Sequence, residues 1–400
     1  MLVGVVGKTN TGKSTFFSAV TLIPVPIENR PFTTIKPNRG IGYLRTPCAC
    51  KDLGVKDNPV NSVCLSGTRL VPVELIDVAG LVPGAWQGKG LGNMFLDDIR
   101  KADALIHVVD AAGATDEEGR PCKPGTRDPV KDVEFLDYEI VMWLVQIIKK
   151  DWKKIVQIVE VTKGSFIDSL ADRLSGLSIK KNHIAEALQK SGLEAEHVGK
   201  WSEEDILKFT SILRRVAKPM IIAANKTDLP YAEENIKNLE KTGYPVVPCC
   251  CEAELILRRA AEKNLIAYKP GDSDFEVKST TMNEEQQRVL NMIKERVLKK
   301  WGSTGIQETM NAAFFKLLNM ITVYPVEDSE ELSDHKGNIL PDVHLIPQGS
   351  TARQLAYQIH TDLGNTFIYA IDARTKMRLG EDHILKDRDI IKIISAKARS

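Results

Sequence analysis

The sequence predicts an α/β fold: a doubly wound, mostly parallel sheet with a helical insertion, followed by a smaller α+β domain at the C-terminus. Short runs rich in Val and Ile recur up to about residue 250, with helical stretches between them, as in a parallel sheet covered by helices. A glycine-rich turn joins the first run to a helix. From about residue 321 the order changes to strand, strand, helix, strand, strand.

The composition fits a globular chain with more than one domain. Its 400 residues exceed what one compact core accommodates, and 43% hydrophobic with 27% charged residues is typical of a soluble protein. The formal net charge of +1 provides no whole-molecule field that would recruit nucleic acid or a membrane, so such partners would need a local patch. Seven cysteines, three of them consecutive, argue against a secreted disulfide framework.

The N-terminus and the hydropathy favour a cytoplasmic location. An apolar strand begins at residue 2 and leaves no room for a basic region and a cleavable signal. No apolar run approaches the roughly 20 residues that span a bilayer, so no membrane partner is expected. The sequence does not determine the oligomeric state.

The strands of the first domain are expected in a regular order. Residues 2–20 are expected to form a strand, a glycine-rich turn and a helix. The further buried strands are expected in LVPVELID (70–77), ALIHVVDAAG (104–113), PMIIAANKTD (219–228) and GYPVVPC (243–249). Ligands of such sheets bind at the carboxyl ends of the strands, and the polar motifs of this chain fall there.

Helices are expected between and after these strands. The strand pattern stops after Gly113 and a helical apolar stripe begins, while Ser202 and Asp205 predict the capped start of a later helix. The predicted organisation is a first domain made of two segments (1–130 and 216–281), a helical insertion (131–215), a helical linker (282–320) and a β-grasp-like domain (321–400).

The C-terminal domain is expected to surround one helix. ITVYPV, the end of HKGNILPDVHLIP, TFIYAIDA and RDIIKIISA are strand-like. STARQLAYQIHTDLG is expected to be a helix, with Thr351 and Gln354 as a capping box and Gly364 as its C-terminal stop.

The turn GKTNTGKS (7–14) fits the P-loop pattern and has the strand and helix that the motif requires. Backbone N–H groups and the helix N-terminus would hold phosphates, Lys13 would contact the β- and γ-phosphates, and Ser14 would ligate Mg²⁺. The alternative is a glycine-rich turn that matches by accident. The nucleotide-binding residues predicted here are Lys8, Asn10, Thr11, Gly12, Lys13, Ser14 and Thr15.

Two further segments are expected to complete the phosphate and magnesium site. In DVAG (77–80), Asp77 would hold Mg²⁺ and the N–H of Gly80 would meet the γ-phosphate. RPFTTIKPN (30–38) lies where a switch segment belongs, and we favour Thr34 over Thr33 as the threonine that completes the metal shell. Lys13, Thr34 and Gly80 are therefore the predicted catalytic groups, and Ser14, Thr34 and Asp77 the predicted metal ligands.

NKTD (225–228) predicts recognition of guanine. The carboxylate of Asp228 can accept both N1–H and the exocyclic amine of guanine, and adenine offers no matching donor pair. Asn225 would contact the N7 side of the purine and tie this loop to the P-loop, and the stem of Lys226 can lie over the ring. The alternative is a polar turn at a strand end.

CCCEAEL (249–255) follows the next strand, where a backbone N–H would meet guanine O6. We expect Cys250 and Cys251 at that position, because a backbone contact tolerates cysteine side chains. A redox or metal role for the triplet is the alternative, although adjacent cysteines are poorly placed to chelate one ion.

These motifs resemble a known family. GKTNTGKS, PFTTIKPN, DVAGLVPGAWQGKGLGN, NKTD and CEAELILRRA are similar to the Obg-related translation-factor GTPases, most of all the YchF type or Obg-like ATPase group, in its archaeal or eukaryotic-like branch. The last 80 residues are similar to a TGS domain, a ubiquitin-like β-grasp module. The resemblance covers nearly the whole chain.

The resemblance implies a cytosolic P-loop NTPase that works on or near the ribosome or RNA, through its C-terminal domain. Hydrolysis of GTP to GDP with Mg²⁺ is expected, slow without a partner. Many YchF-type proteins prefer ATP and show an altered base motif; the intact NKTD favours GTP here, with ATP the alternative. A nucleotide-bound binding module with negligible hydrolysis is a further alternative, as is a metabolic P-loop enzyme that phosphorylates a small molecule.

Leu81 stands where Ras-like proteins carry a water-orienting glutamine, and a leucine cannot orient water. Related GTPases with a hydrophobic residue there turn it away from the nucleotide, and some use a P-loop asparagine to hold K⁺ beside the phosphates. Asn10 occupies that position, so K⁺ is a second candidate cofactor. The alternative is an asparagine that stabilises the turn without a metal.

Two weaker patterns remain. Cys48, Cys50 and Cys64 could bind zinc, with Asp57 as a fourth ligand, although zinc sites more often show paired C-x₂-C spacing. Free cysteines are the alternative. In the C-terminal domain, a local basic patch for RNA could be formed by Arg353, Arg374, Lys376 and Arg378. The alternative is that these side chains belong to an ordinary solvated face.

Overall fold

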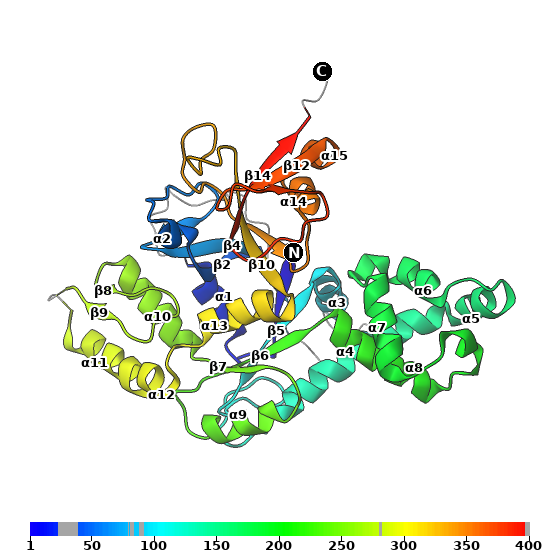
Figure 1. The fold of residues 1–400 in the computed structure, drawn as a ribbon. Coiled ribbons are helices and arrows are strands. Elements are labelled where there is room, and N and C mark those ends of the chain that lie inside the picture. The colour runs from blue at the N-terminus through cyan, green and yellow to red at the C-terminus, as the bar shows by residue number, and fades with distance from the viewer. Residues whose placement is uncertain (23–38, 79, 81–83, 88–91, 280–281, 397–400) are drawn as a thin grey trace. The chain divides into compact units, whose positions relative to one another are not determined.

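The structure is a computed structural model, and it describes residues 1–22, 39–78, 80, 84–87, 92–279 and 282–396 (Figure 1). The described chain divides into two compact units, each of which is described by itself. One contains Glu74–Thr309 together with the N-terminal strand and the first helix. The other contains Gly42–Val73 and the chain from Met310 onward.

The N-terminal portion of the chain forms a seven-stranded sheet. Its strand order is β2-β4-β1-β5-β6-β7, with β3 paired to β4. The strands from β4 to β7 in this order are parallel, and β3 is antiparallel to β4. The expected doubly wound, mostly parallel sheet is thereby confirmed. Its strands are β1 (Leu2–Val6), β2 (Arg39–Pro47), β3 (Val63–Leu65), β4 (Thr68–Asp77), β5 (Ala104–Asp110), β6 (Met220–Asn225) and β7 (Val246–Pro248).

The central strands are buried along their whole length. Every residue of β1, β5 and β6 is buried, which explains why these segments are nearly continuous apolar runs rather than alternating ones. The helices that follow the strands are α1 (Lys13–Thr21), α3 (Gly92–Lys101), α9 (Ala232–Glu240) and α10 (Cys251–Glu262). Strands β2 and β3 and the helix α2 (Ala49–Leu53) between them were not predicted.

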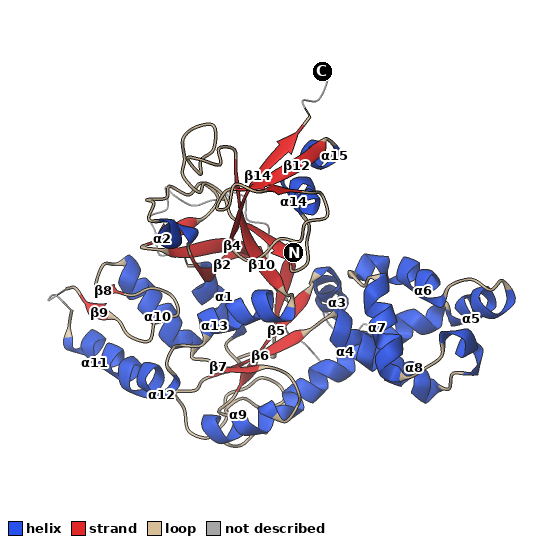
Figure 2. Cartoon of the chain, viewed as in Figure 1, coloured by secondary structure: helices blue, strands red, loops and turns tan. Residues whose placement is uncertain are grey.

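From Val130 to Ala217 the chain is helical, as expected for the insertion (Figure 2). Ser202 and Asp205 form the predicted capping box. Four aromatic rings pack together inside this segment, with centroids 5.3–6.3 Å apart: Trp152, Phe166, Trp201 and Phe209. The helices are α4 (Val130–Lys150), α5 (Trp152–Val156), α6 (Phe166–Leu174), α7 (Lys181–Ser191) and α8 (Glu203–Ala217), with shorter turns η3 (Gln157–Val161), η4 (Ser175–Leu177) and η5 (Ala195–Lys200).

A short hairpin and further helices follow α10. The predicted helix over 282–305 with a glycine stop is confirmed, because its last turn ends at Gly302 with a φ of 80°. These elements are β8 (Ile266–Ala267), β9 (Glu276–Val277), α11 (Glu284–Ile293), η6 (Lys294–Leu298), α12 (Lys299–Trp301), α13 (Ile306–Asn311) and η7 (Ala312–Leu317).

The C-terminal sheet has five strands in the order β11-β10-β14-β12-β13. The central pair β10 and β14 is parallel and the other pairs are antiparallel, so the expected β-grasp-like arrangement is confirmed. The elements are β10 (Met320–Val326), β11 (His344–Pro347), α14 (Ala352–Ile359), α15 (Thr361–Asn365), β12 (Phe367–Asp372), β13 (Arg378–Leu379) and β14 (Asp389–Ser395).

One predicted detail of this domain is wrong. Thr351 and Gln354 form the expected capping box, but the helix ends at Ile359 and Gly364 is not its stop. Gly364 lies inside the second short helix, where a Cβ atom would come within 2.2 Å of the Tyr357 ring. Close packing, not a left-handed cap, therefore explains this glycine.

The compact units do not follow the predicted ranges. Residues 42–73 lie within the first segment predicted for the N-terminal domain, yet they form one unit with the C-terminal strands. Asn61 Nδ2 donates to the Val343 carbonyl at 3.0 Å, and Arg69 Nη2 donates to the Leu340 carbonyl at 2.9 Å. Partners about 270 to 280 residues apart leave no local signal in the sequence.

Candidate nucleotide-binding site

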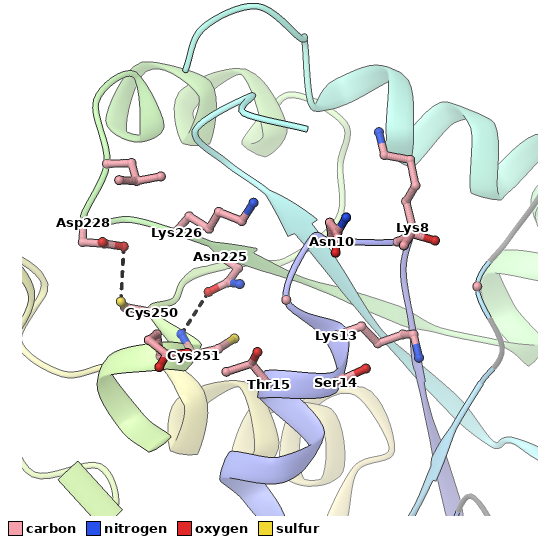
Figure 3. Close-up of a pocket in the computed structure, with 15 residues that line it drawn as sticks. Lys8, Asn10, Lys13, Ser14, Thr15, Asn225, Lys226, Asp228, Cys250 and Cys251 are labelled. Carbon is pink, nitrogen blue, oxygen red and sulfur yellow. Dashed lines mark hydrogen bonds between the residues drawn. The ribbon is translucent and has the colours of Figure 1, made fainter. Parts of the chain in front are cut away.

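A cavity of about 570 Å³ opens where the P-loop, the loop after β6 and the loop after β7 meet (Figure 3). These loops follow the carboxyl ends of parallel strands, where ligands of doubly wound sheets bind. The volume falls in the range of small-molecule sites. The cavity is lined by Lys8, Thr9, Asn10, Gly12, Lys13, Ser14, Thr15, Gly80, Asn225, Lys226, Asp228, Leu229, Cys250, Cys251 and Glu252.

Nearly all the predicted nucleotide-binding residues meet in this cavity. Thr11 is buried behind it, and its hydroxyl donates to the Lys8 carbonyl at 2.9 Å. Thr34 and Leu81 lie outside the described residues, so the structure does not place the predicted switch threonine. Thr9, Leu229 and Glu252 line the cavity without having been predicted.

The P-loop requires glycine at position 12. Gly12 has a φ of 99°, and a Cβ atom there would lie 2.0 Å from the amide nitrogen of Asn225. Only glycine allows the loop to turn this way while the base-binding loop approaches so closely. The turn places Lys13 and Ser14 in the first turn of α1, whose N-terminal N–H groups suit an anion.

Lys13 forms an ion pair with Asp77, the last residue of β4. The two residues come together because β1 and β4 are parallel neighbours with Val5 opposite Asp77. Both side chains are largely buried, exposed by 12% and 27%. The charge of Lys13 is therefore balanced by Asp77.

Asn225 connects the P-loop to the loop after β7. The sequence predicted its contact with the P-loop. Its amide nitrogen donates to the Thr11 carbonyl at 2.8 Å. Its amide oxygen accepts the backbone N–H of Cys251 at 2.9 Å, the bond drawn in Figure 3. Asn225 is only 4% exposed. One buried side chain therefore fixes the distance between the phosphate end and the base end of the cavity.

We expect Asn225→Ala to destabilise the protein by about 2–4 kcal/mol, because a buried carbonyl and a buried N–H both lose their partners. The free energy of unfolding from urea titration, without nucleotide, measures this. Asn182→Ala on the exposed surface of α7 is the control and should change it by less than about 0.5 kcal/mol. An unchanged free energy in Asn225→Ala would show that the bridge carries no stability.

Asp228 lies at the base end of the cavity, half buried. The thiol of Cys250 donates to one of its carboxylate oxygens, with a sulfur–oxygen distance of 3.3 Å (Figure 3). Burial, followed by the negative charge of Asp228, raises the pKa of the Cys250 thiol well above its usual value. Cys250 is therefore a neutral donor that positions the carboxylate.

Two residues that the sequence reasoning missed hold Lys226. Its ammonium group contacts Asp110 at 2.7 Å and the Thr115 hydroxyl at 3.1 Å, and Thr115 also donates to Asp110. Lys226 has a left-handed φ of 66°. The sequence held a signal for Asp110, because this aspartate ends β5. Strand β5 is the neighbour of β6 in the sheet, and Asp110 is paired in register with Asn225.

Two P-loop side chains contact neighbouring segments. The Lys8 ammonium group bonds both oxygens of Asp132, at 3.0 and 2.9 Å, in the first turn of α4. Burial is the main cause that raises the pKa of Asp132, and Lys8 opposes it. The amide nitrogen of Asn10 donates to the Gly119 carbonyl at 2.7 Å. Lys8 thus links the P-loop to the helical insertion.

The three consecutive cysteines are buried thiols. Burial raises the pKa of Cys249 to about 12 and that of Cys251 well above its ordinary value, so neither is a reactive thiolate at neutral pH. Within the described portion of the chain, the cysteine-containing group that could hold a metal lies elsewhere, at residues 48–64. The triplet contributes packing, the Cys250 thiol that donates to Asp228, and the backbone N–H of Cys251.

A P-loop after the first strand and an N-K-x-D loop after β6 line one cavity, and the aspartate that ends β4 contacts Lys13 of that P-loop. This combination defines the guanine-nucleotide-binding class of P-loop proteins. Three family profiles match the chain: 50S ribosome-binding GTPase at 2–159, the G4 motif-containing domain of the YGR210-like Obg-like GTPases at 223–328, and the TGS domain at 336–395. The chain belongs to the YchF/Obg-like GTPase family.

The similar proteins match this chain over nearly its full length. A GTP-binding protein of Methanocaldococcus jannaschii is 52% identical over 398 residues, which cover 99% of each chain. The ribosome-binding ATPase YchF of Escherichia coli O157:H7 is 26% identical over 413 residues and 98% of each chain. The crystal structure of a GTP-binding protein from Pyrococcus horikoshii OT3 matches with a TM-score of 0.79 at 43% identity, covering 99% of this chain and 100% of that one.

Among the residues that the structure describes, no helix is both long enough and apolar enough to cross a bilayer.

Proposed function

We propose that this GTP-binding protein hydrolyses GTP to GDP and phosphate with Mg²⁺, and acts as a nucleotide-dependent switch in the cytoplasm. The observation that carries the proposal is the bridge through Asn225, which joins the P-loop and the loop of Cys251 around one cavity that also contains Lys13 and Asp228. A triphosphate at one end and a guanine at the other would use all of these groups.

The base end favours GTP over ATP. The carboxylate of Asp228 has acceptor sites for both N1–H and the exocyclic amine of guanine in addition to the Cys250 thiol. Adenine presents an unprotonated N1 there, which would face a carboxylate without a proton between them. The N–H of Cys251, which already meets the Asn225 oxygen, is the donor proposed for guanine O6.

The residues at the phosphate end suit Mg²⁺. The Ser14 hydroxyl lines the cavity, and the contact of Asp77 with Lys13 shows that a carboxylate reaches the P-loop. Hydroxyl and carboxylate oxygens are the ligands that Mg²⁺ prefers. We propose Ser14 and Asp77 as its protein ligands, with Thr34 as the third, and the ion would neutralise phosphate charge. Lys13 would turn from Asp77 to the phosphates, and the N–H of Gly80 would contact the γ-phosphate.

Helix α4 is the proposed route by which nucleotide state reaches the helical insertion. Asp132 of α4 holds the P-loop residue Lys8. Further along the same helix, the buried carboxylate of Glu139 accepts the backbone N–H groups of Gly84 at 2.8 Å and Trp86 at 3.1 Å. The segment after D-x-x-G and the P-loop therefore both bond to one rigid helix.

Docking on a ribosome or RNA is proposed through the C-terminal domain, and it rests on the TGS match and on relatives named as ribosome-binding ATPases. The basic patch that the sequence suggested gives little support. Arg353 pairs with Glu381, Arg374 with Asp52 at 3.6 Å, and Lys376 with Glu330 at 3.0 Å. Arg378 lies over the Tyr369 ring at 4.7 Å. Most of this positive charge is already balanced within the unit.

A comparison of GTP with ATP, in KCl and in NaCl at equal ionic strength, tests the proposed hydrolysis and the K⁺ site together. Asn10 donates its amide nitrogen to Gly119, so its amide oxygen is the atom proposed to hold K⁺. We expect single-turnover hydrolysis of GTP to exceed that of ATP and to rise about 10-fold or more in KCl, because a cation would offset charge in the transition state.

The variant Asn10→Ala separates the two ideas. It should remove the difference between the salts and leave the preference for GTP. Equal rates in KCl and NaCl for the parent protein would assign Asn10 a structural role, and the missing catalytic group would then be sought by adding purified ribosomes. No hydrolysis of either nucleotide with ribosomes present would contradict the proposed function and favour a nucleotide-bound binding module.

A further inference from the structure

Three thiols and one carboxylate converge in the unit that contains the C-terminal strands. Cys48 precedes α2, Cys50 lies in its first turn, Asp57 is in the following loop, and Cys64 is the middle residue of β3. The four potential ligand atoms all lie within 4.8 Å of one another. A set of one ligand atom from each of four residues, gathered this closely, is the arrangement of a closed structural metal site.

The distances suit a tetrahedral ion. With zinc–sulfur bonds of about 2.3 Å, two sulfur ligands of a tetrahedron lie about 3.8 Å apart. The sulfur atoms of Cys50 and Cys64 are 3.8 Å apart. The Cys48 sulfur lies 3.1 Å from an oxygen of Asp57, the separation of a thiol–carboxylate hydrogen bond. Replacing that proton by an ion would widen the gap by only a few tenths of an ångström.

A buried arginine supports this cluster from outside. Arg69 is fully buried, and its Nη2 contacts the same Asp57 oxygen at 3.2 Å. The guanidinium also donates to the Ser62 hydroxyl at 2.9 Å and to the Leu340 carbonyl at 2.9 Å. Three thiolates, one carboxylate and Zn²⁺ would sum to −2, and the arginine would bring this to −1. A hydrogen-bonded partner of this kind orients carboxylate ligands in metal sites.

The backbone is shaped to hold the sulfur atoms together. Ser66 and Gly67 form the turn between β3 and β4, with φ of 50° and 80°, and a Cβ atom at Gly67 would come within 2.3 Å of the Lys51 side chain. This packing places Cys64 against α2.

We propose that Cys48, Cys50, Asp57 and Cys64 bind one zinc ion that fastens residues 48–64 within this unit. Thiolate ligands select zinc over magnesium or calcium, and four protein ligands leave no open position for catalysis. The fastened segment in turn bonds to residues 338–343. Asn58 N donates to the Ile339 carbonyl at 3.1 Å, and Asn61 exchanges two 3.0 Å hydrogen bonds with Val343.

A disulfide between Cys50 and Cys64 is the competing use of these atoms. A disulfide would use only two of the four converging side chains, so it would not explain why Cys48, Asp57 and the buried Arg69 lie beside them. It would also require an oxidant. The metal site accounts for all four converging groups and for the arginine, and so we favour it.

Metal analysis of the full-length protein tests the proposal. We expect one equivalent of zinc per chain after purification without chelator, measured by elemental mass spectrometry. After removal with a strong chelator, Co²⁺ should restore one equivalent and give the thiolate charge-transfer and visible bands of tetrahedral cobalt. Cys64→Ser should lose the ion, while Cys122→Ser, at a partly exposed cysteine of the other unit, should retain it.

Two readouts keep the test independent of whether Cys64→Ser folds. Asp57→Asn retains three sulfur ligands, so it should still bind Co²⁺ but shift the visible bands. Removing zinc from the parent protein should lower its melting temperature, and zinc should restore it. Protein that carries no metal and takes up neither Zn²⁺ nor Co²⁺ overturns the proposal. A Cys50–Cys64 disulfide found by peptide mapping in metal-free protein overturns it in favour of the disulfide.

Discussion

Replacing Lys13 by alanine should reduce single-turnover GTP hydrolysis by about 10²-fold or more, with the fold intact. The side chain lies at the start of α1, and the other two lysines that line the cavity, Lys8 and Lys226, are paired with Asp132 and Asp110. Removing one preorganised electrostatic contact to the transition state costs about 10²–10³-fold. Without nucleotide, the substitution also leaves Asp77 without its ion-pair partner.

Quenched-flow or filter-based measurement of phosphate release gives the rate, and circular dichroism confirms the fold. Lys190→Ala is the control, because Lys190 is an exposed lysine of α7 that pairs with Glu186 in the helical insertion. It should hydrolyse GTP at the parent rate. Hydrolysis at the parent rate in Lys13→Ala would rule out this P-loop as the active site.

Asp228→Asn should weaken GTP binding by about 10²-fold and improve binding of xanthosine triphosphate. The asparagine amide keeps one acceptor and replaces the other by a donor, so one guanine donor loses its acceptor and meets another donor. Hydrogen bonds to charged groups contribute about 1.5–3 kcal/mol, and the loss of about 3 kcal/mol corresponds to about 10²-fold in Kd. Xanthine carries a carbonyl where guanine has its amine, and the asparagine N–H can donate to it.

Equilibrium titration with fluorescent analogues of GTP and xanthosine triphosphate measures whether the preference changes from the first to the second. Asp172→Asn, on the exposed surface of α6, serves as the matched control and should bind GTP like the parent. A variant that loses both nucleotides equally would indicate damage to the loop rather than a changed base contact. Unchanged GTP affinity in Asp228→Asn would contradict the base assignment.

The sequence was sufficient for the features of the site that are local. The P-loop, D-x-x-G and N-K-x-D motifs are contiguous, and each is recognisable because backbone turns and ligand contacts impose their residues at fixed spacing. Parallel topology then brings them to one cavity, since buried strands of this kind end at the same edge of the sheet. The buried runs at β1, β5 and β6 could be predicted for the same reason.

The roles of other residues were decided by tertiary contacts. Asp110, Thr115 and Asp132 hold Lys226 and Lys8 from more than 100 residues away. Asp110 ends a strand, but neither Thr115 nor Asp132 carries a local signal of membership in the site. The sequence suggested Gly364 as a helix stop, but the structure packs it against the Tyr357 ring, where a Cβ atom would clash. The basic side chains of the C-terminal domain looked like a patch, and acidic neighbours in space balance most of them.

The sequence by itself determined the class of fold and identified the P-loop and the N-K-x-D loop, because each motif consists of residues that lie next to one another in the chain. Only the tertiary structure decided that Gly42–Val73 packs with the C-terminal strands, and that Arg69 lies beside the group of three cysteines and Asp57. Those arrangements depend on hydrogen bonds and burial between distant segments, such as Arg69 with Leu340, which the order of residues does not encode locally.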